Sequence, residues 1–192
     1  MEEIKLLEKQ LTRMRGMNRF YHHQFLIDVR IFFVLTLLLF YLSFDNYFSH
    51  YLINLTSIFG SVLLAFHAYY LIFSRHYSEF IEKKINNLSG KTVYVTHKLE
   101  NKYFFPINDK KIVVAKIGKD FSWFSFVTLF ITFFGVSFYF YSLYNIYFFI
   151  GNKYFTYLSI AILFVTFIIG YWWFVRNTGE ERLTEVYKDG FN

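Results

Sequence analysis

Two long apolar stretches, almost free of charge, dominate the pattern of hydrophobic and polar positions. Between Arg30 and Arg75 the only charged residue is Asp45, and between Asp120 and Arg176 the only one is Lys153. A membrane-spanning helix needs roughly 20 mostly apolar residues, so each stretch is long enough for two spans joined by a short turn. The pattern therefore predicts four transmembrane helices, at residues 31–49, 52–73, 122–146 and 154–175.

The residues before the first span have the pattern of an amphipathic helix that runs into it. Apolar residues recur there at spacings of three and four and form one stripe: Ile4, Leu7, Leu11 and Met14. Such a stripe either packs on its own chain or the bilayer surface, or forms a short coiled coil between copies. In the second case these four residues would mediate oligomerisation.

A charged insertion separates the two apolar stretches. The pattern predicts a helical extension at residues 77–87, which ends at Ser89-Gly90. Three short alternating segments follow, at residues 92–96, 102–105 and 111–117, and predict strands. Three strands in so short a segment cannot bury a core of their own, so they must lean on the membrane helices or on another subunit.

The predicted fold class is an all-α membrane protein with four transmembrane helices in two hairpins. An N-terminal cytoplasmic amphipathic helix and a small cytoplasmic β-rich insertion are expected in addition to the four spans. The expected divisions are the amphipathic helix at 1–30, the first hairpin at 31–73, the insertion at 74–120, the second hairpin at 121–175 and a cytoplasmic tail at 176–192.

The distribution of charge predicts the orientation. Every basic residue except Lys153 lies before, between or after the two hairpins, so the positive-inside rule places both termini and the insertion on the inner side. We expect a bacterial inner-membrane protein with cytoplasmic termini, the alternative being an organelle inner membrane with termini in the matrix. Orientation and anionic lipid of the bilayer account for the net charge of +6 better than nucleic acid does, so no specific nucleic acid partner is expected.

Small residues in the spans are candidates for close helix packing or for lining a pore. A small-residue face lets transmembrane backbones approach one another closely. In the second span this face contains Ser57, Ser61, Ala65 and Ala68, with Gly60 beside it, and in the third span the candidates are Thr128, Thr132 and Gly135.

Histidines are the only plausible ligands near the membrane. His22, His23 and His67 are candidates for a haem or metal site between neighbouring helices. The simpler expectation is that His67 hydrogen-bonds a Ser or Tyr across the bundle. The sequence contains no cysteine, no nucleophile elbow, no phosphate loop and no dense histidine array, so we expect no catalytic residue, no metal, no cofactor and no enzyme.

Two local runs resemble the bacterial two-transmembrane domain, which is found alone or attached to signalling proteins. The runs are Arg19-Phe20-Tyr21-His22-His23, ahead of the first span, and Leu64-Ala65-Phe66-His67-Ala68 with residues 79–85. Separately, the size, the four spans and the inward termini resemble the small four-span accessory membrane protein of type VI-B CRISPR loci. That resemblance implies a role in modulating an RNA-guided antiviral response or the membrane itself.

The function expected from the sequence is that of a non-enzymatic, self-associating integral membrane protein. It would act as an accessory or effector, with pore formation as one mode, in a bacterial stress or antiviral defence system. The alternative is a structural scaffold subunit of a larger membrane complex, such as an organelle-encoded respiratory complex. The expected partners are copies of the chain or other membrane subunits, together with a cytoplasmic protein.

Overall fold

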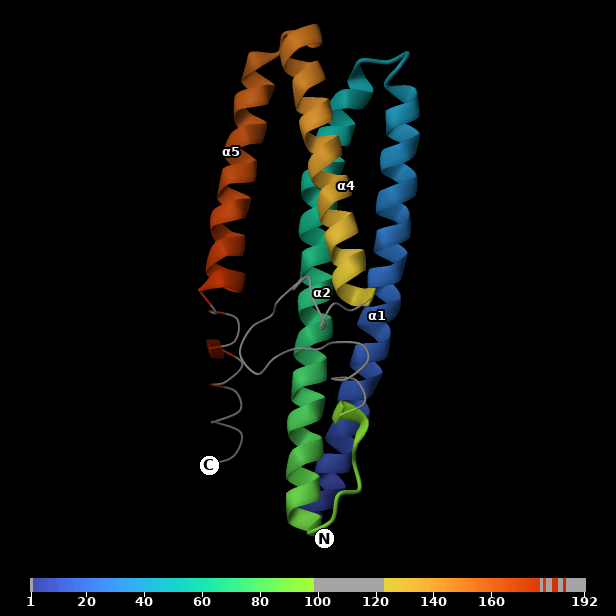
Figure 1. The fold of residues 1–192 in the computed structure, drawn as a ribbon, viewed down its shortest axis with the longest axis vertical. Coiled ribbons are helices and arrows are strands. Elements are labelled where there is room, and N and C mark those ends of the chain that lie inside the picture. The colour runs from blue at the N-terminus through green and yellow to red at the C-terminus, as the bar shows by residue number, and fades with distance from the viewer. Residues whose placement is uncertain (1, 99–122, 177, 179–180, 183–184, 186–192) are drawn as a thin grey trace. The chain divides into compact units, whose positions relative to one another are not determined.

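The computed structural model describes residues 2–98, 123–176, 178, 181, 182 and 185, and these residues are helical with short connections and no strand. The helices are α1 (Glu2–Leu42), α2 (Phe48–Ser89), α4 (Trp123–Asn145) and α5 (Lys153–Gly170), and Figure 1 shows their order along the chain. Short π-helical turns, η1 (Ile146–Ile150) and η2 (Tyr171–Val175), follow α4 and α5. Four helices in this part of the chain are long and apolar enough to cross a membrane, which confirms the predicted number of spans.

The helix ends differ from the predicted spans where turn residues intervene. The first span was expected to reach residue 49, but α1 ends at Leu42, and the side chain of Asn46 accepts a hydrogen bond from the backbone of Phe48 at the start of α2. The end of α2 is as predicted, at Ser89, because Gly90 has a φ of +64°, which favours glycine. Between η1 and α5, Gly151 has a φ of +77° and Asn152 caps α5 by accepting from the backbone of Phe155.

The described residues form two compact units. The first takes its described residues from Met1–Ile31, Leu63–Asn108 and Val113–Ile131, and the second takes them from Phe32–Val62 and Thr132–Asn192. Both α1 and α2 therefore contribute one part to each unit. We call residues 2–30 and 74–98, the charged part of the first unit, the stem.

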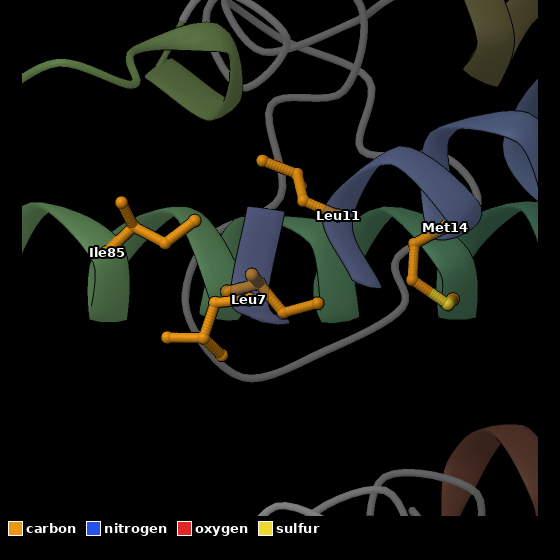
Figure 2. Close-up of a cluster of buried hydrophobic side chains, with 5 residues drawn as sticks. Leu7, Leu11, Met14 and Ile85 are labelled. Atoms are coloured by element: carbon orange, nitrogen blue, oxygen red, sulfur yellow. The ribbon is translucent and has the colours of Figure 1, made fainter. Parts of the chain in front are cut away.

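An apolar seam between α1 and α2 forms the core of the stem. Leu7, Leu11 and Met14 of α1 are buried against Ile81 and Ile85 of α2 (Figure 2), with Ile4 among the partly buried residues at the edge. Full burial of a side chain of this kind contributes about 1.5–3 kcal/mol. Of the two expectations for the N-terminal stripe, the structure places it on its own chain.

The expected β-rich insertion is not supported. Residues 92–95 are irregular and residues 96–98 form a helical turn, so the strand predicted at 92–96 is wrong. The backbone N–H groups of Val93 and Tyr94 donate to the side chain of Asn86 and not to a neighbouring strand. The other two expected strands, at 102–105 and 111–117, lie outside the described residues.

Aromatic rings and small residues form the core of the second unit. Phe33 and Phe40 of α1 contact Phe134, Phe138 and Tyr141 of α4, with ring centroids 4.2–5.4 Å apart. Of the four helices, α5 with the turn η2 is the least covered by other parts of the chain. In its most apolar 18-residue segment 11% of the residues are buried, against 28% in the corresponding segments of α1 and of α2.

Candidate functional site

The three candidate histidines do not gather into one site. His22 and His23 are exposed on α1, whereas the side chain of His67 on α2 is only 12% exposed and pairs with Asp28. In the part of the chain that the structure describes, no three His, Cys, Asp or Glu side chains come close enough to hold a metal ion. The expected partner of His67, a Ser or Tyr, is also wrong, because its partner is a carboxylate.

Asp28 of α1 and His67 of α2 pair with each other, and their side chains are 9% and 12% exposed. His67 Nδ1 lies against Asp28 Oδ2, and Gln24 Nε2 donates to Asp28 Oδ1 at 3.2 Å. The ring of Tyr21 stacks on that of Tyr70, with centroids 4.9 Å apart, and its centroid lies 6.3 Å from that of the His67 ring. A carboxylate and a histidine that are buried together hold α1 and α2 in one register, since separating them would leave two polar groups unpaired.

A second buried charge, Glu82 of α2, is the centre of the stem. Its side chain is 2% exposed and accepts hydrogen bonds from Arg15 at 2.6 Å and from both the ring and the backbone of His97, at 2.8 and 3.1 Å. Arg15 comes from α1 and His97 from the helical turn after α2. One carboxylate therefore ties three segments together.

These hydrogen bonds set the protonation of Glu82. Burial raises the pKa of the carboxyl, but the hydrogen bonds from Arg15 and His97 and the charge of Arg15 together outweigh it, so the pKa lies below its ordinary value. The carboxylate form is thus the form that the stem stabilises.

The segment that carries His97, residues 90–98, which we call the strap, is fastened by one amide. Asn86 Oδ1 accepts from the backbone of Val93 and of Tyr94, each at 2.9 Å, and Asn86 Nδ2 donates to the carbonyl of Tyr94 at 2.7 Å. The Tyr94 hydroxyl in turn donates to Glu8 of α1 at 3.0 Å, and Arg15 lies over the ring of Tyr94. The strap is therefore held by side chains from both stem helices.

In the second unit, part of the predicted small-residue face receives an aromatic ring. A Cβ added to Gly60 would lie 2.4 Å from Phe32 Cδ2, and one added to Gly135 would lie 2.9 Å from Ser61 Oγ and 3.5 Å from Phe32 Cζ. Ser57 lies buried one turn before Ser61 and its carbonyl accepts from Ser61 Oγ at 2.6 Å. Ser57, Gly60, Ser61 and Gly135 thus belong to one packed contact between α1, α2 and α4.

The remaining small-residue candidates are not part of this contact. Ala65 is exposed on α2, Thr132 is exposed on α4, and Thr128 is half-buried in the first unit. The structure therefore assigns helix packing to four of the candidates and leaves the others on accessible or partly accessible surfaces.

A buried polar network joins α2, α4 and α5 in the second unit. Asn54 is fully buried, donates to Ser142 Oγ at 3.2 Å and accepts from Ser159 Oγ at 2.6 Å. The Tyr139 hydroxyl lies 3.0 Å from Ser159 Oγ, and Ser142 Oγ donates to the Tyr139 carbonyl at 2.8 Å. In lipid such hydrogen bonds hold helices together, because hydrocarbon offers these groups no alternative partner.

Sequence reasoning missed the residues that carry these contacts. Asp28 lies just before the predicted first span, among other charged residues, and Glu82 is one of several acids in a helix with many charges. A signal was available for Asn54, since it is an amide inside a predicted span. Comparisons with protein-family models, with curated proteins and with solved structures find no match to this chain.

Proposed function

We propose that the chain is a non-enzymatic integral membrane protein, acting as an accessory or effector, whose stem presents a folded surface to a partner. The observation that carries this proposal is the construction of the stem around Glu82. Arg15, Glu82 and His97 bring α1, α2 and the strap together, and α1 and α2 each continue into the apolar residues of the second unit. A buried charge with this many partners gives a surface of one defined shape, which a binding partner needs.

The proposed location is a bacterial inner membrane with both termini and the stem in the cytoplasm. The positive-inside distribution supports this orientation, and an organelle inner membrane with the stem in the matrix is the alternative. A single cysteine at Asp45, which is exposed in the turn between α1 and α2, should react with an impermeant thiol reagent in intact cells. One at Lys91, exposed in the strap, should not. Labelling at Lys91 and protection at Asp45 would reverse the orientation.

The proposed setting is a stress or antiviral defence system. Its support is the resemblance in architecture to the four-span accessory membrane protein of type VI-B CRISPR loci, together with the local resemblance to the two-transmembrane domain. The described part of the chain has four helices long and apolar enough to supply the four spans of this setting.

The test uses Glu82 and a matched acid on the same helix. Glu82→Ala removes the centre of the stem, whereas Glu79→Ala removes an acid that pairs with Lys83 on the same helix and has no contact with Arg15 or His97 among those described. Both variants should insert in the membrane. In a host that carries the native gene cluster, phage resistance should fall with Glu82→Ala and persist with Glu79→Ala. Equal resistance in all three strains would refute a role for the stem.

A scaffold subunit is the second candidate, and one observation favours it over a pore. Of the residues proposed to line a conduction path, Gly135 and Ser61 lie in the packed contact beside Phe32 and Ser57 is buried, whereas Ala65, Thr128 and Thr132 lie outside that contact. A scaffold predicts no leakage from dye-filled liposomes at any protein density. Leakage that scales with protein density and survives Glu82→Ala would instead support pore formation by another surface.

A further inference from the structure

The outer face of α1 in the stem combines exposed cations with two exposed apolar side chains. Leu6 and Phe20 are 64% and 62% exposed. Four basic residues on the same helix are also exposed: Lys5, Lys9, Arg13 and Arg19.

Four of these residues, Leu6, Lys9, Arg13 and Phe20, lie along one face of the helix. Leu6, Arg13 and Phe20 are seven residues apart, which returns to nearly the same angle after two turns, and Lys9 lies between Leu6 and Arg13. This face spans about 21 Å by helical rise. It lies on the side of α1 away from the seam of Leu7, Leu11 and Met14, so the contact with α2 does not cover it. Gly16 is exposed on this face and has no atom within 4 Å of an added Cβ, which leaves room for a close approach.

The stem does not neutralise these cations. Four acids of the stem have other partners: Glu3 pairs with Lys84, Glu8 accepts from Tyr94, Glu79 pairs with Lys83, and Glu82 accepts from Arg15 and His97. Within the described residues, no ion pair involves Lys5, Lys9, Arg13 or Arg19. The face therefore presents positive charge flanked by apolar side chains.

We propose that this outer face, defined by Leu6, Lys9, Arg13 and Phe20, binds an acidic amphipathic helix of a partner protein. The partner helix sets a carboxylate against Arg13 and places apolar side chains against Leu6 and Phe20, at intervals of seven residues. This inference rests on the proposed function, since it names the surface by which the stem meets its partner. Charge complementarity sets the register, and the two apolar side chains provide the buried anchors.

Two other occupants fit the face less well. A second copy of the chain would bring Lys9 and Arg13 against the same cations, and like charges in contact oppose association. A nucleic acid duplex offers phosphates to the cations, but its backbone offers no apolar surface to Leu6 or Phe20. The pairing of charge with apolar anchors thus favours a protein helix.

The test uses the full chain in nanodiscs of zwitterionic lipid and a labelled helical peptide of about three heptads with Leu, Glu and Leu at the matching positions. A control peptide carries Lys in place of the Glu. Fluorescence anisotropy should show binding of the Glu peptide that weakens as salt rises. Arg13→Glu should lower that affinity about tenfold and should bring binding of the Lys peptide up by a similar factor. Leu6→Ala and Phe20→Ala should each weaken the Glu peptide several-fold.

Lys91→Glu serves as the control, because it changes an exposed cation of the first unit that lies off α1, and it should leave the affinity unchanged. No salt-dependent binding of the Glu peptide would overturn the inference. Tighter binding of a duplex RNA, insensitive to Leu6→Ala and Phe20→Ala, would overturn it in favour of a nucleic acid surface. The outcome is separable from the proposed function. If cysteine labelling places the stem in the cytoplasm and the peptide still does not bind, only this inference falls.

Discussion

The contact between Gly60 and Phe32 allows the sharpest test of the packing in the second unit. In Gly60→Ala the added Cβ would lie 2.4 Å from Phe32 Cδ2 and 2.7 Å from Cε2, whereas carbon atoms in ordinary contact are about 3.5–4.0 Å apart. The ring would have to move by about 1 Å. It is 3% exposed, and the rings of Phe33 and Phe134 lie edge-on beside it, so little space is open to it.

Overpacking of this kind costs about 1–3 kcal/mol. The higher helix propensity of alanine offsets up to about 1 kcal/mol of that cost, so we expect Gly60→Ala to lower the free energy of unfolding by about 1–2 kcal/mol. Gly16→Ala is the matched control, because the same propensity gain occurs there with nothing within 4 Å of the new methyl group. It should be neutral or stabilising.

The measurement is equilibrium unfolding of the purified chain in mixed micelles. Phe32→Leu, which shortens the ring side chain, should reduce the cost of Gly60→Ala by about 1 kcal/mol in a double-mutant cycle. The reasoning is refuted if the two glycine variants have equal stabilities, or if the substitutions at Gly60 and Phe32 are simply additive.

Three further outcomes follow from the buried polar contacts. Asn54→Ala should destabilise the second unit by about 1 kcal/mol, because it removes two interhelical hydrogen bonds. Ser57→Ala is the control and should leave the stability unchanged, because the buried Ser57 Oγ has no hydrogen-bond partner within the described residues. Both variants are measured by the same unfolding assay. His67→Phe should cost about 3 kcal/mol by leaving the Asp28 carboxylate unpaired, and Asp28→Asn in the same chain should recover most of the loss. Because the pKa of Glu82 is lowered in the folded stem, its contribution to stability is present above the ordinary value of 4.5 and is lost as the pH falls through the lower folded pKa. The protection of the strap amides from hydrogen exchange, corrected for the intrinsic rate at each pH, should therefore fall as the pH drops below 4.5 in the wild type and change less in Glu82→Gln.

The sequence predicted the helices because their signals are local. Exclusion of charge from two stretches marks four spans, and Ser89-Gly90 marks the end of α2, which the structure confirms. The strand at 92–96 was wrong for a related reason. Alternation of Thr and Val with a tyrosine is typical of a strand, but a strand needs a neighbour for its backbone, and here Asn86 supplies the hydrogen bonds from a preceding helix.

The polar contacts could not be predicted because they join residues that are distant in sequence. Arg15 and Glu82 are 67 residues apart, and Asn54 and Ser159 are 105 apart. Nothing in the composition of either helix indicates which acid receives which cation. The small-residue pattern did indicate close packing on α2, but the occupant, Phe32, is an ordinary apolar residue of the first span and carries no signal of its own.

The two units differ in the kind of contact that joins α1 to its neighbours, and this difference bears on where the membrane lies. In the stem, the seam is apolar side chains, Leu7 and Leu11 on Ile81 and Ile85, which associate when water is the alternative environment. In the second unit the helices meet through a glycine that receives a ring and through the hydrogen bonds of Asn54, which are the contacts that remain favourable when lipid is the alternative. An apolar seam loses its hydrophobic driving force in hydrocarbon, where close packing and hydrogen bonds hold helices together, and an Asn–Ser bond would gain little in water. The crossover between the two kinds of contact falls on α1 between Met14 and Phe32, which brackets Arg30. The change in side-chain contacts and the end of the charged stretch at Arg30 therefore fall on the same part of α1, where the apolar residues of the predicted first span begin.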